Sequence, residues 1–357
     1  MDDEKIEAVG WQAIDDALQD LYAAREPKHF GALISYELGG DDPLRGISAY
    51  WRDQPVPHWH FITYGFTELF EKDKDNPDPG ISGFGFELTF RLACEAADAD
   101  KEPPLWVLNF LQNLARYVFD SGNVFREGHY LNANGPIAVD EPTQICAIAF
   151  IRDPELPPRQ TPNGSVEFLQ IVGLTGDEEF ALKQWATLKA LDVFREHIPL
   201  YVTDLRRASL LGNSAVHDAI IEGARRDGSS TGRIFVDRLG FDKRSPLVGK
   251  TTYVLTLGAL QIPELLTLLP LRLPFGRDFE LIGHEITVWF ANSERCSVAE
   301  TDEGVGIYLN KEALEELCEI LKIKAGEYIL NNFKGLIFEV EKTLIRDSSG
   351  NVVETLG

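Results

Sequence analysis

The chain has 357 residues, of which 44% are hydrophobic and 25% are charged, so it is long enough for two domains that each bury a core. Its 57 acidic residues outnumber its 34 Lys and Arg residues, which gives a formal net charge of −23 at pH 7. This composition excludes a wholly disordered chain. The charge opposes binding to nucleic acid or anionic membranes and favours a basic partner, although solubility alone would also account for it.

The sequence shows no sign of a membrane or secretory destination. No stretch approaches the roughly 18 consecutive apolar residues of a membrane span. The start, Met1-Asp2-Asp3-Glu4, is acidic, whereas a secretory signal begins with a basic segment and an apolar run. Cys94, Cys146, Cys296 and Cys318 are far apart and predict neither a disulfide framework nor a structural zinc site. We therefore expect a cytoplasmic protein with buried, reduced thiols and no cofactor.

The first part of the chain mixes helices with β-rich segments. Apolar residues at three- and four-residue steps predict an amphipathic helix over residues 5–25, which Pro27 ends. Aromatic and β-branched residues predict strands over 33–38, 58–65 and 84–92. Pro103-Pro104 opens a helix that runs to about Phe119 and stops at Ser121-Gly122.

Further elements lead to the most flexible composition in the chain. They are strands over 144–151 and 165–173, a helix over 177–197, a short strand over 201–205 and a helix over 214–226. Asp227-Gly228-Ser229-Ser230-Thr231-Gly232 then has the composition of a linker. We expect an N-terminal domain of residues 1–226, a linker at 227–232 and a smaller C-terminal domain of residues 233–357.

The C-terminal part continues the same mixture. Strands are predicted over 233–238, 251–257, 268–273, 285–291 and 333–345, and a helix is predicted over 311–322. Strands and helices do not alternate in the steady order of a doubly wound sheet. The sequence therefore predicts the α+β class.

Two local patterns resemble enzyme sites, and neither is complete. His58 and His60 are two residues apart on a predicted strand, so both imidazoles would point to one face and could bind a metal. The missing third ligand favours structural histidines. Gly228-Ser229-Ser230-Thr231-Gly232 matches the hydrolase pattern GxSxG, but no apolar strand precedes it. We therefore predict no catalytic residue, and a metal-dependent hydrolase that uses His58 and His60 stays an alternative.

Several longer runs are together more specific than these motifs. In chain order they are GGDDPL at 39–44, HWHFITYG at 58–65, SGFGFELTFRL at 82–92, LARYVF at 114–119, TPNG at 161–164, FLQIVG at 168–173 and TDLRR at 203–207. Their order and content resemble the Suppressor of fused family, in particular its compact bacterial-type members. The resemblance is strong over about residues 1–210 and weaker at 268–271 and 275–279.

The resemblance implies a non-enzymatic protein of two α+β domains, each with a mixed or mostly antiparallel sheet packed against helices. Animal members hold a short segment of a zinc-finger transcription factor between the domains, where it adds a strand. In that mode backbone hydrogen bonds supply affinity and neighbouring side chains supply selection. The resemblance to bacterial members also implies an immunity protein that neutralises a toxin, and a strongly acidic chain suits a basic toxin domain.

The resemblance also implies a partner site. Tyr117 matches a tyrosine of the peptide groove in animal members. The acidic residue expected just after Gly128 is His129 here, and the one expected before Asp153 is Arg152. The resemblance therefore implies the fold and the cleft. It does not imply the transcription-factor ligand, because these changes of charge should not preserve affinity for the same ligand. We expect Tyr117, His129, Arg152 and Asp153 to contact a protein or peptide partner, and a structural component of an oligomer stays a further alternative.

Overall fold

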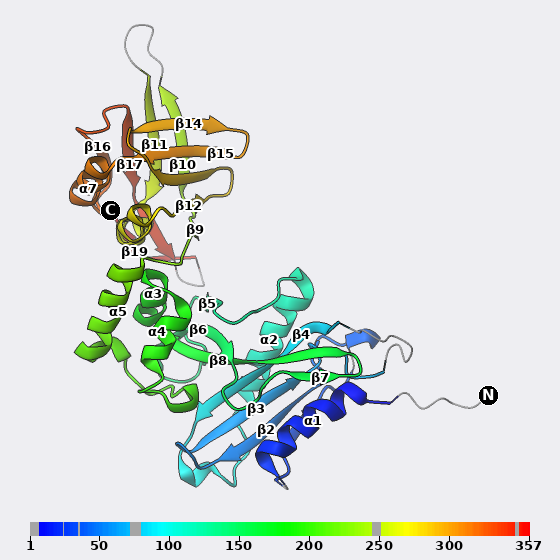
Figure 1. The fold of residues 1–357 in the computed structure, drawn as a ribbon. Coiled ribbons are helices and arrows are strands. Elements are labelled where there is room, and N and C mark those ends of the chain that lie inside the picture. Colours follow the sequence, from blue (N-terminus) through cyan, green and yellow to red (C-terminus); the bar gives the residue numbers. More distant parts are fainter. Residues whose placement is uncertain (1–6, 24, 35, 72–79, 245–250, 347–349) are drawn as a thin grey trace. The chain divides into compact units, whose positions relative to one another are not determined.

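The computed structural model describes residues 7–23, 25–34, 36–71, 80–244, 251–346 and 350–357 (Figure 1). The chain forms two compact units. The first consists of Met1–Phe180 and Thr187–His217, and the second of Ala181–Ala186 and Asp218–Gly357. Both units mix helices with sheets, which confirms the predicted α+β class. None of the helices in the described ranges is long and apolar enough to cross a membrane.

An eight-stranded sheet forms the centre of the first unit (Figure 1). Its strands are β1 Lys28–Gly31, β2 Gly46–Arg52, β3 His58–Tyr64, β4 Ile81–Ala93, β5 Tyr130–Asn132, β6 Ile145–Arg152, β7 Arg159–Thr161 and β8 Gly164–Thr175. The path through the sheet is β1-β2-β3-β4-β8-β6-β5, and β7 pairs with β8 outside this path. All neighbours pair antiparallel except β4 and β8. The sheet is therefore mostly antiparallel, and β1 and β5 end its path.

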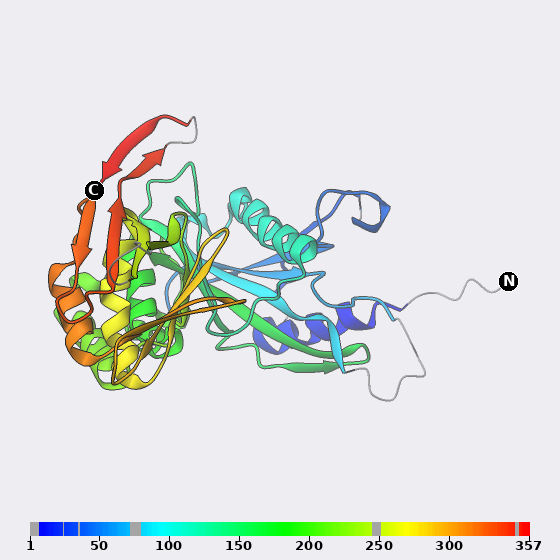
Figure 2. The same ribbon diagram turned by 90° about the horizontal axis from the view of Figure 1, so that it is seen from above.

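Two helices cover opposite faces of this sheet (Figure 2). They are α1, Val9–Tyr22, and α2, Leu105–Ser121, and each buries an apolar stripe in a different cluster. On β3, Phe61 belongs to the α2 cluster and the next residue, Ile62, belongs to the α1 cluster. Successive strand residues point to opposite faces, so this alternation places one helix on each side.

The sequence prediction agrees with α2 at both ends, whereas α1, Val9–Tyr22, is shorter than the predicted helix. The helix predicted over 5–25 is α1, although Lys5, Ile6 and Ala24 lie outside the described residues. α2 ends where Gly122 adopts the left-handed conformation with a φ of 71°. Glycine tolerates that conformation without the steric cost that other residues incur, which is why it stops helices well.

Two strands predicted in the first unit are wrong. Within residues 33–38, Leu33 and Ile34 are exposed and Tyr36–Leu38 is a 3₁₀ turn, while the edge strand β1 ends earlier, at Gly31. Within residues 201–205, only Thr203 makes a single bridge, to Leu92. A short apolar run satisfies the sequence pattern of a strand, but it becomes one only where a neighbouring strand is in register.

The helix predicted over 177–197 is two helices, α3 Gly176–Gln184 and α4 Thr187–Phe194. The helix is interrupted at Trp185, which makes two hydrogen bonds to residues later in the chain. Its carbonyl accepts from Ser230 N at 2.6 Å, and its indole N–H donates to Asp227 at 2.8 Å. These bonds hold the tryptophan in place at the point where the helix is interrupted.

The described residues of the second unit form three sheets. Their orders are β10-β11-β17-β16, β14-β15-β13-β12-β9 and β18-β19. The strands are β9 Arg233–Phe235, β10 Leu239–Arg244, β11 Thr252–Gly258, β12 Phe279–Ile282, β13 Thr287–Asn292, β14 Ser297–Thr301, β15 Gly304–Leu309, β16 Gly326–Ile329, β17 Leu336–Glu341, β18 Thr343–Arg346 and β19 Val352–Leu356. One apolar cluster unites strands of the two larger sheets with α6, Ile262–Leu268, and α7, Lys311–Ile320.

The strand predicted over 268–273 is also wrong. This stretch continues from α6 into 3₁₀ turns, at Leu269–Leu271 and Leu273–Phe275. Leu265, Leu268 and Leu269 are fully buried, and their spacing of three and four residues fits a helix. The run of leucines is apolar enough for a buried strand, so its composition alone does not distinguish the two.

The segment predicted as a linker is held by hydrogen bonds within the second unit. Ser229 is buried, its N–H donates to Leu271 O at 2.7 Å, and its hydroxyl donates to Lys183 O at 2.5 Å. The compact units themselves divide inside α5, Ser214–Asp227, after His217. The domain bounds 1–226 and 233–357 therefore stay a prediction.

The four cysteines are free, and they are partly buried where the sequence predicted buried thiols. Burial raises the pKa of the Cys94 thiol to about 11 and also raises the pKa values of Cys146 and Cys318. A thiol reacts as its thiolate, so these raised values make the three cysteines poor nucleophiles at neutral pH.

Candidate functional site

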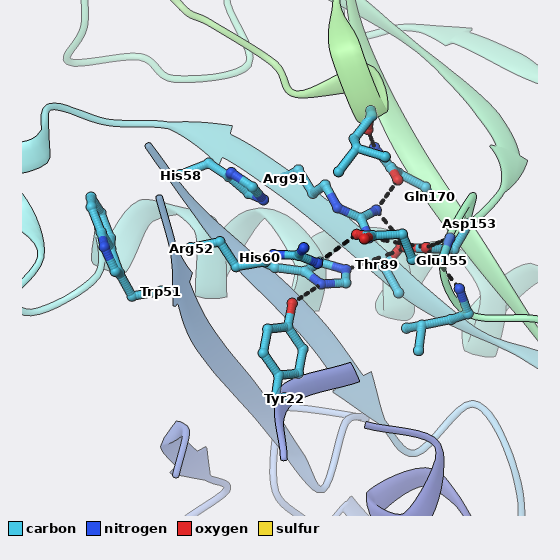
Figure 3. A network of polar contacts seen from close by, with 12 residues as sticks. Tyr22, Trp51, Arg52, His58, His60, Thr89, Arg91, Asp153, Glu155 and Gln170 are labelled. Carbon is cyan, nitrogen blue, oxygen red and sulfur yellow. Dashed lines mark hydrogen bonds and ion pairs between the residues drawn. The ribbon is translucent and has the colours of Figure 1, made fainter. Parts of the chain in front are cut away.

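A network of polar side chains lies on the face of the first unit's sheet that α1 covers (Figure 3). His60 on β3, Arg91 on β4 and Gln170 on β8 alternate with residues of the α2 cluster, such as Phe90 and Leu169. Strand periodicity therefore directs all three polar side chains to the same face. Arg91 was not predicted as a site residue, although its charge between the apolar Phe90 and Leu92 is a visible signal in the sequence.

Arg91 is the centre of this network. It is fully buried, and its guanidinium donates to both carboxylate oxygens of Asp153, at 2.7 and 3.0 Å. It also donates to Glu155 at 3.0 Å and to the side-chain oxygen of Gln170. Arg52 reaches the same Glu155 oxygen at 2.7 Å. Each charged side chain of the network therefore contacts a side chain of opposite charge, as burial requires.

Asp153 joins the network to the end of β6. It accepts the Thr89 hydroxyl at 2.7 Å and the backbone N–H groups of Glu155 and Leu156 at 2.9 and 3.1 Å. Burial by itself would raise the pKa of Asp153, but Arg91 and His60 outweigh it and hold that pKa well below its usual range. The carboxyl is therefore ionised at neutral pH and serves as the counter-ion of Arg91.

The two histidines do lie on one face, as predicted, but both are fully buried. The Tyr22 hydroxyl bonds His60 Nδ1 at 2.5 Å, and His60 Nε2 faces Asp153 at 3.3 Å without hydrogen-bond geometry. His58 donates from Nδ1 to Val56 O at 2.7 Å. Burial lowers the pKa of His58 to about 4 and that of His60 to about 3, so both are neutral at pH 7.

The burial and hydrogen bonds of His58 and His60 indicate a structural role for both side chains. Among the described residues, no group of three or more His, Cys, Asp or Glu side chains is placed to hold a metal ion. His58, His60 and Arg91 have no exposed surface, so a solute could reach them only after the network opened. The arrangement supports packing of β3, β4 and β8 under α1.

Three of the four predicted partner residues lie in a different place, beside the end strand β5. Tyr117, on α2, is 44% exposed and stacks on Phe125 with ring centroids 5.7 Å apart. Phe125 in turn stacks on Phe150 of β6 at 4.3 Å. The N–H of Phe150 donates to the carbonyl of His129 at 2.9 Å, which holds the segment before β5 against β6.

The charges at this place are exposed. Arg152, the last residue of β6, lies 3.6 Å from Glu127 and 3.3 Å from Glu167. His129 is exposed as well, and partial burial together with Arg126 lowers its pKa. The structure therefore brings Tyr117, His129 and Arg152 together around residues 125–130. We call this group of residues the β5 edge site.

Asp153, the fourth predicted partner residue, does not belong to the β5 edge site. It is 5% exposed and points into the buried network with Arg91. β5 itself was not predicted, because a three-residue strand has no measurable periodicity. Phe125, the aromatic residue that supports Tyr117, was not predicted either.

Comparisons with known proteins agree with this fold. Residues 40–208 match the family model described as Suppressor of fused protein (SUFU). The chain is 35% identical over 238 residues to the Suppressor of fused homolog of Homo sapiens and 34% identical to that of Mus musculus. Each match covers 62% of this chain and 48% of the relative, so the chain spans about half the length of these curated relatives.

Two solved structures are similar as well. The crystal structure of Drosophila Suppressor of Fused covers 96% of this chain and 99% of that chain, with a TM-score of 0.77 at 22% identity. A chain of the Sufu-Fu complex crystal structure has a TM-score of 0.55 at 28% identity and covers 60% of this chain and 97% of that chain. The first likeness shows the fold, and the second comes from a protein solved in complex with another protein.

Proposed function

Because this chain resembles the Suppressor of fused family over residues 40–208, we propose that it is a non-enzymatic cytoplasmic protein of that family that adds a segment of a protein partner as a strand beside β5. The observation that carries the proposal is the β5 edge site, where Tyr117, His129 and Arg152 lie around residues 125–130, which lead into a strand at the end of its sheet. An end strand is where a peptide can continue the hydrogen-bond ladder. The Sufu-Fu complex supports a protein partner for a related chain.

Tyr117 supplies the apolar anchor of this site. Its ring is half exposed and stacks on Phe125, which in turn stacks on Phe150, so a partner side chain that covers the free surface meets a rigid aromatic stack. Aromatic residues that are already fixed lose little entropy on binding, and they are frequent hot spots at interfaces. Tyr117 is therefore the residue whose loss weakens binding most.

Arg152 sets the charge preference. Its contacts with Glu127 and Glu167 are long and exposed, and such pairs contribute little stability. A basic partner residue can take either glutamate from Arg152 at small cost. Together with the net charge of −23, this favours a basic partner such as a toxin domain, for which the protein would act as an immunity factor.

The placement of the partner segment between the two domains stays a prediction. The metal-dependent hydrolase receives no support from a specific observation, since His58 and His60 are fully buried. The alternative of a structural component of an oligomer likewise receives no support from a specific observation. Nucleic acid and anionic membranes are disfavoured by the charge of the chain.

Selection of peptides tests the strand-addition site. A display library of random linear peptides is selected on the whole protein, and the affinity of the enriched peptides is measured for variants. Tyr117→Ala should weaken binding by about tenfold or more, or about 1.4 kcal/mol. Arg152→Glu should shift the selected peptides towards more Lys and Arg.

Two residues of the second unit provide matched controls. Tyr253 stacks on Phe241 at 5.6 Å, and Arg244 pairs with Glu327 at 3.5 Å, so Tyr253→Ala and Arg244→Glu make the same chemical changes elsewhere. Neither control should change affinity by more than about twofold. If Tyr117→Ala and Arg152→Glu both leave peptide binding unchanged, the site is wrongly placed.

A further inference from the structure

The outer surface of α2 carries a second feature, which the β5 edge site does not use. Leu105, Asn109 and Asn113 are exposed and follow one another at four-residue steps, so they form a row along the helix that ends before Tyr117 of the β5 edge site. A hollow lies on each side of the N-terminal part of this row, and Asn109 lines both. Figure 2 shows α2 lying on the outside of the sheet.

The first hollow, of about 280 Å³, lies between α2 and residues 137–141. Trp106 and Phe110 line it and pack against the buried Phe90 with ring centroids 6.2 and 5.7 Å away. The loop is anchored by a hydrogen bond from Ile137 N to Ile145 O at 3.0 Å. Its tip, Val139, is 87% exposed, which leaves a large apolar side chain beside an aromatic hollow.

The second hollow, of about 470 Å³, lies between α2 and the loop that follows β1. Leu33 and Ile34 line it and are exposed. Gln112 fixes this loop to α2, because its side chain accepts from Leu44 N at 3.2 Å and donates to Leu44 O at 3.4 Å. Arg116 adds a hydrogen bond to Asp41 O at 3.1 Å. These bonds hold residues 41–44, at the end of the loop, against α2 before any ligand binds.

Acidic residues surround these apolar hollows. Asp140 and Glu141 line the first, and Asp41 lines the second. Within the described part of the chain, none of these three carboxylates is in an ion pair, whereas the neighbouring Asp42 pairs with Arg116. Three free acids beside exposed apolar side chains are chemically complementary to a segment that carries both cations and apolar anchors.

We infer that the α2 surface binds one basic, amphipathic segment of a protein partner. Two apolar side chains of that segment occupy the hollows on either side of Asn109. Lys or Arg residues next to them pair with Asp41 on one side and with Asp140 and Glu141 on the other. The preorganised loops reduce the entropy cost of this binding. The inference does not depend on strand addition at the β5 edge site.

The experiment uses the whole protein and a display library of random linear peptides. Enriched peptides should combine at least two apolar with at least two basic residues. Asp140→Lys combined with Glu141→Lys should weaken them by about tenfold or more. The matched control is Asp302→Lys combined with Glu303→Lys, which makes the same charge change in an exposed turn of the second unit and should cost less than about twofold.

Two further variants keep the test decisive. Leu33→Ser changes a side chain that is fully exposed, so it leaves the fold intact and should still weaken the peptides by removing an apolar contact in the second hollow. Tyr117→Ala should not affect these peptides, which separates them from ligands of the β5 edge site. The inference is overturned if the two charge-reversal pairs weaken binding equally, if Leu33→Ser has no effect, or if no basic amphipathic peptide is enriched.

Discussion

Arg152 and Asp153 are neighbours in the chain, but they belong to regions with opposite physical properties. Arg152 is exposed and lies more than 3 Å from each of two glutamates, whereas Asp153 is buried and bonds both nitrogens of the Arg91 fork. The exposed pair can exchange partners at little cost, and the buried pair cannot. In this protein, therefore, a charge is available for recognition where it is weakly held and serves the fold where it is fully satisfied.

Removing Asp153 should have the largest effect. Asp153→Ala leaves Arg91 buried without its main counter-ion, which should lower the free energy of unfolding by about 3–5 kcal/mol. Urea denaturation followed by tryptophan fluorescence measures this change. The double variant Arg91→Met with Asp153→Leu should recover much of the loss, because it removes both charges together. A loss below about 1 kcal/mol for Asp153→Ala would show that the pair is not the centre of the network.

The buried histidines predict an intermediate effect that depends on pH. The folded-state pKa values of His58, about 4, and His60, about 3, lie below the value of about 6.5 in an unfolded chain. The unfolded state therefore binds more protons between these limits, and the free energy of unfolding falls as the pH drops from about 6.5 to about 4. The pKa of Asp153 is lowered too, so its contribution is lost at still lower pH, below about 4.

His58→Gln isolates this effect. Its Nε2 atom has no hydrogen-bond partner among the described residues, so the substitution breaks only the bond to Val56 O there. We expect the variant to lose about 2 kcal/mol less stability than the parent chain between pH 6.5 and 4. Comparing two chains that differ at one residue cancels the other titrating groups. Parallel stability curves over this range would show that His58 is not held neutral by burial.

The sequence predicted the elements that have a strong local signal. α2 and β3 lie close to where the sequence predicted them, because proline, glycine and an apolar stripe mark α2 and aromatic residues mark β3. The leucine-rich run at 268–273 was misassigned because a fully buried segment is apolar in either conformation. β5 is too short to show any period.

The candidate site was also predicted only in part. The family resemblance brought forward Tyr117, His129 and Arg152, and the structure places them together. It could not show that Asp153 is buried, because the residue that decides this, Arg91, is 62 positions away in the chain. The stacking of Tyr117 on Phe125 likewise depends on how α2 meets the segment before β5, which no local pattern records.

Arg152→Gln should have the smallest effect on stability and gives the sharpest test of the comparison. It removes only two long, exposed contacts, so the free energy of unfolding should change by less than about 0.5 kcal/mol. It also releases Glu127 and Glu167, so association with a basic peptide selected on this protein should become faster at low salt, and the gain should vanish as salt screens the charges. Stopped-flow mixing at two ionic strengths measures both rates. A large loss of stability would place Arg152 with Asp153 in the fold, and slower association would mean that Arg152 itself receives an acidic group of the partner.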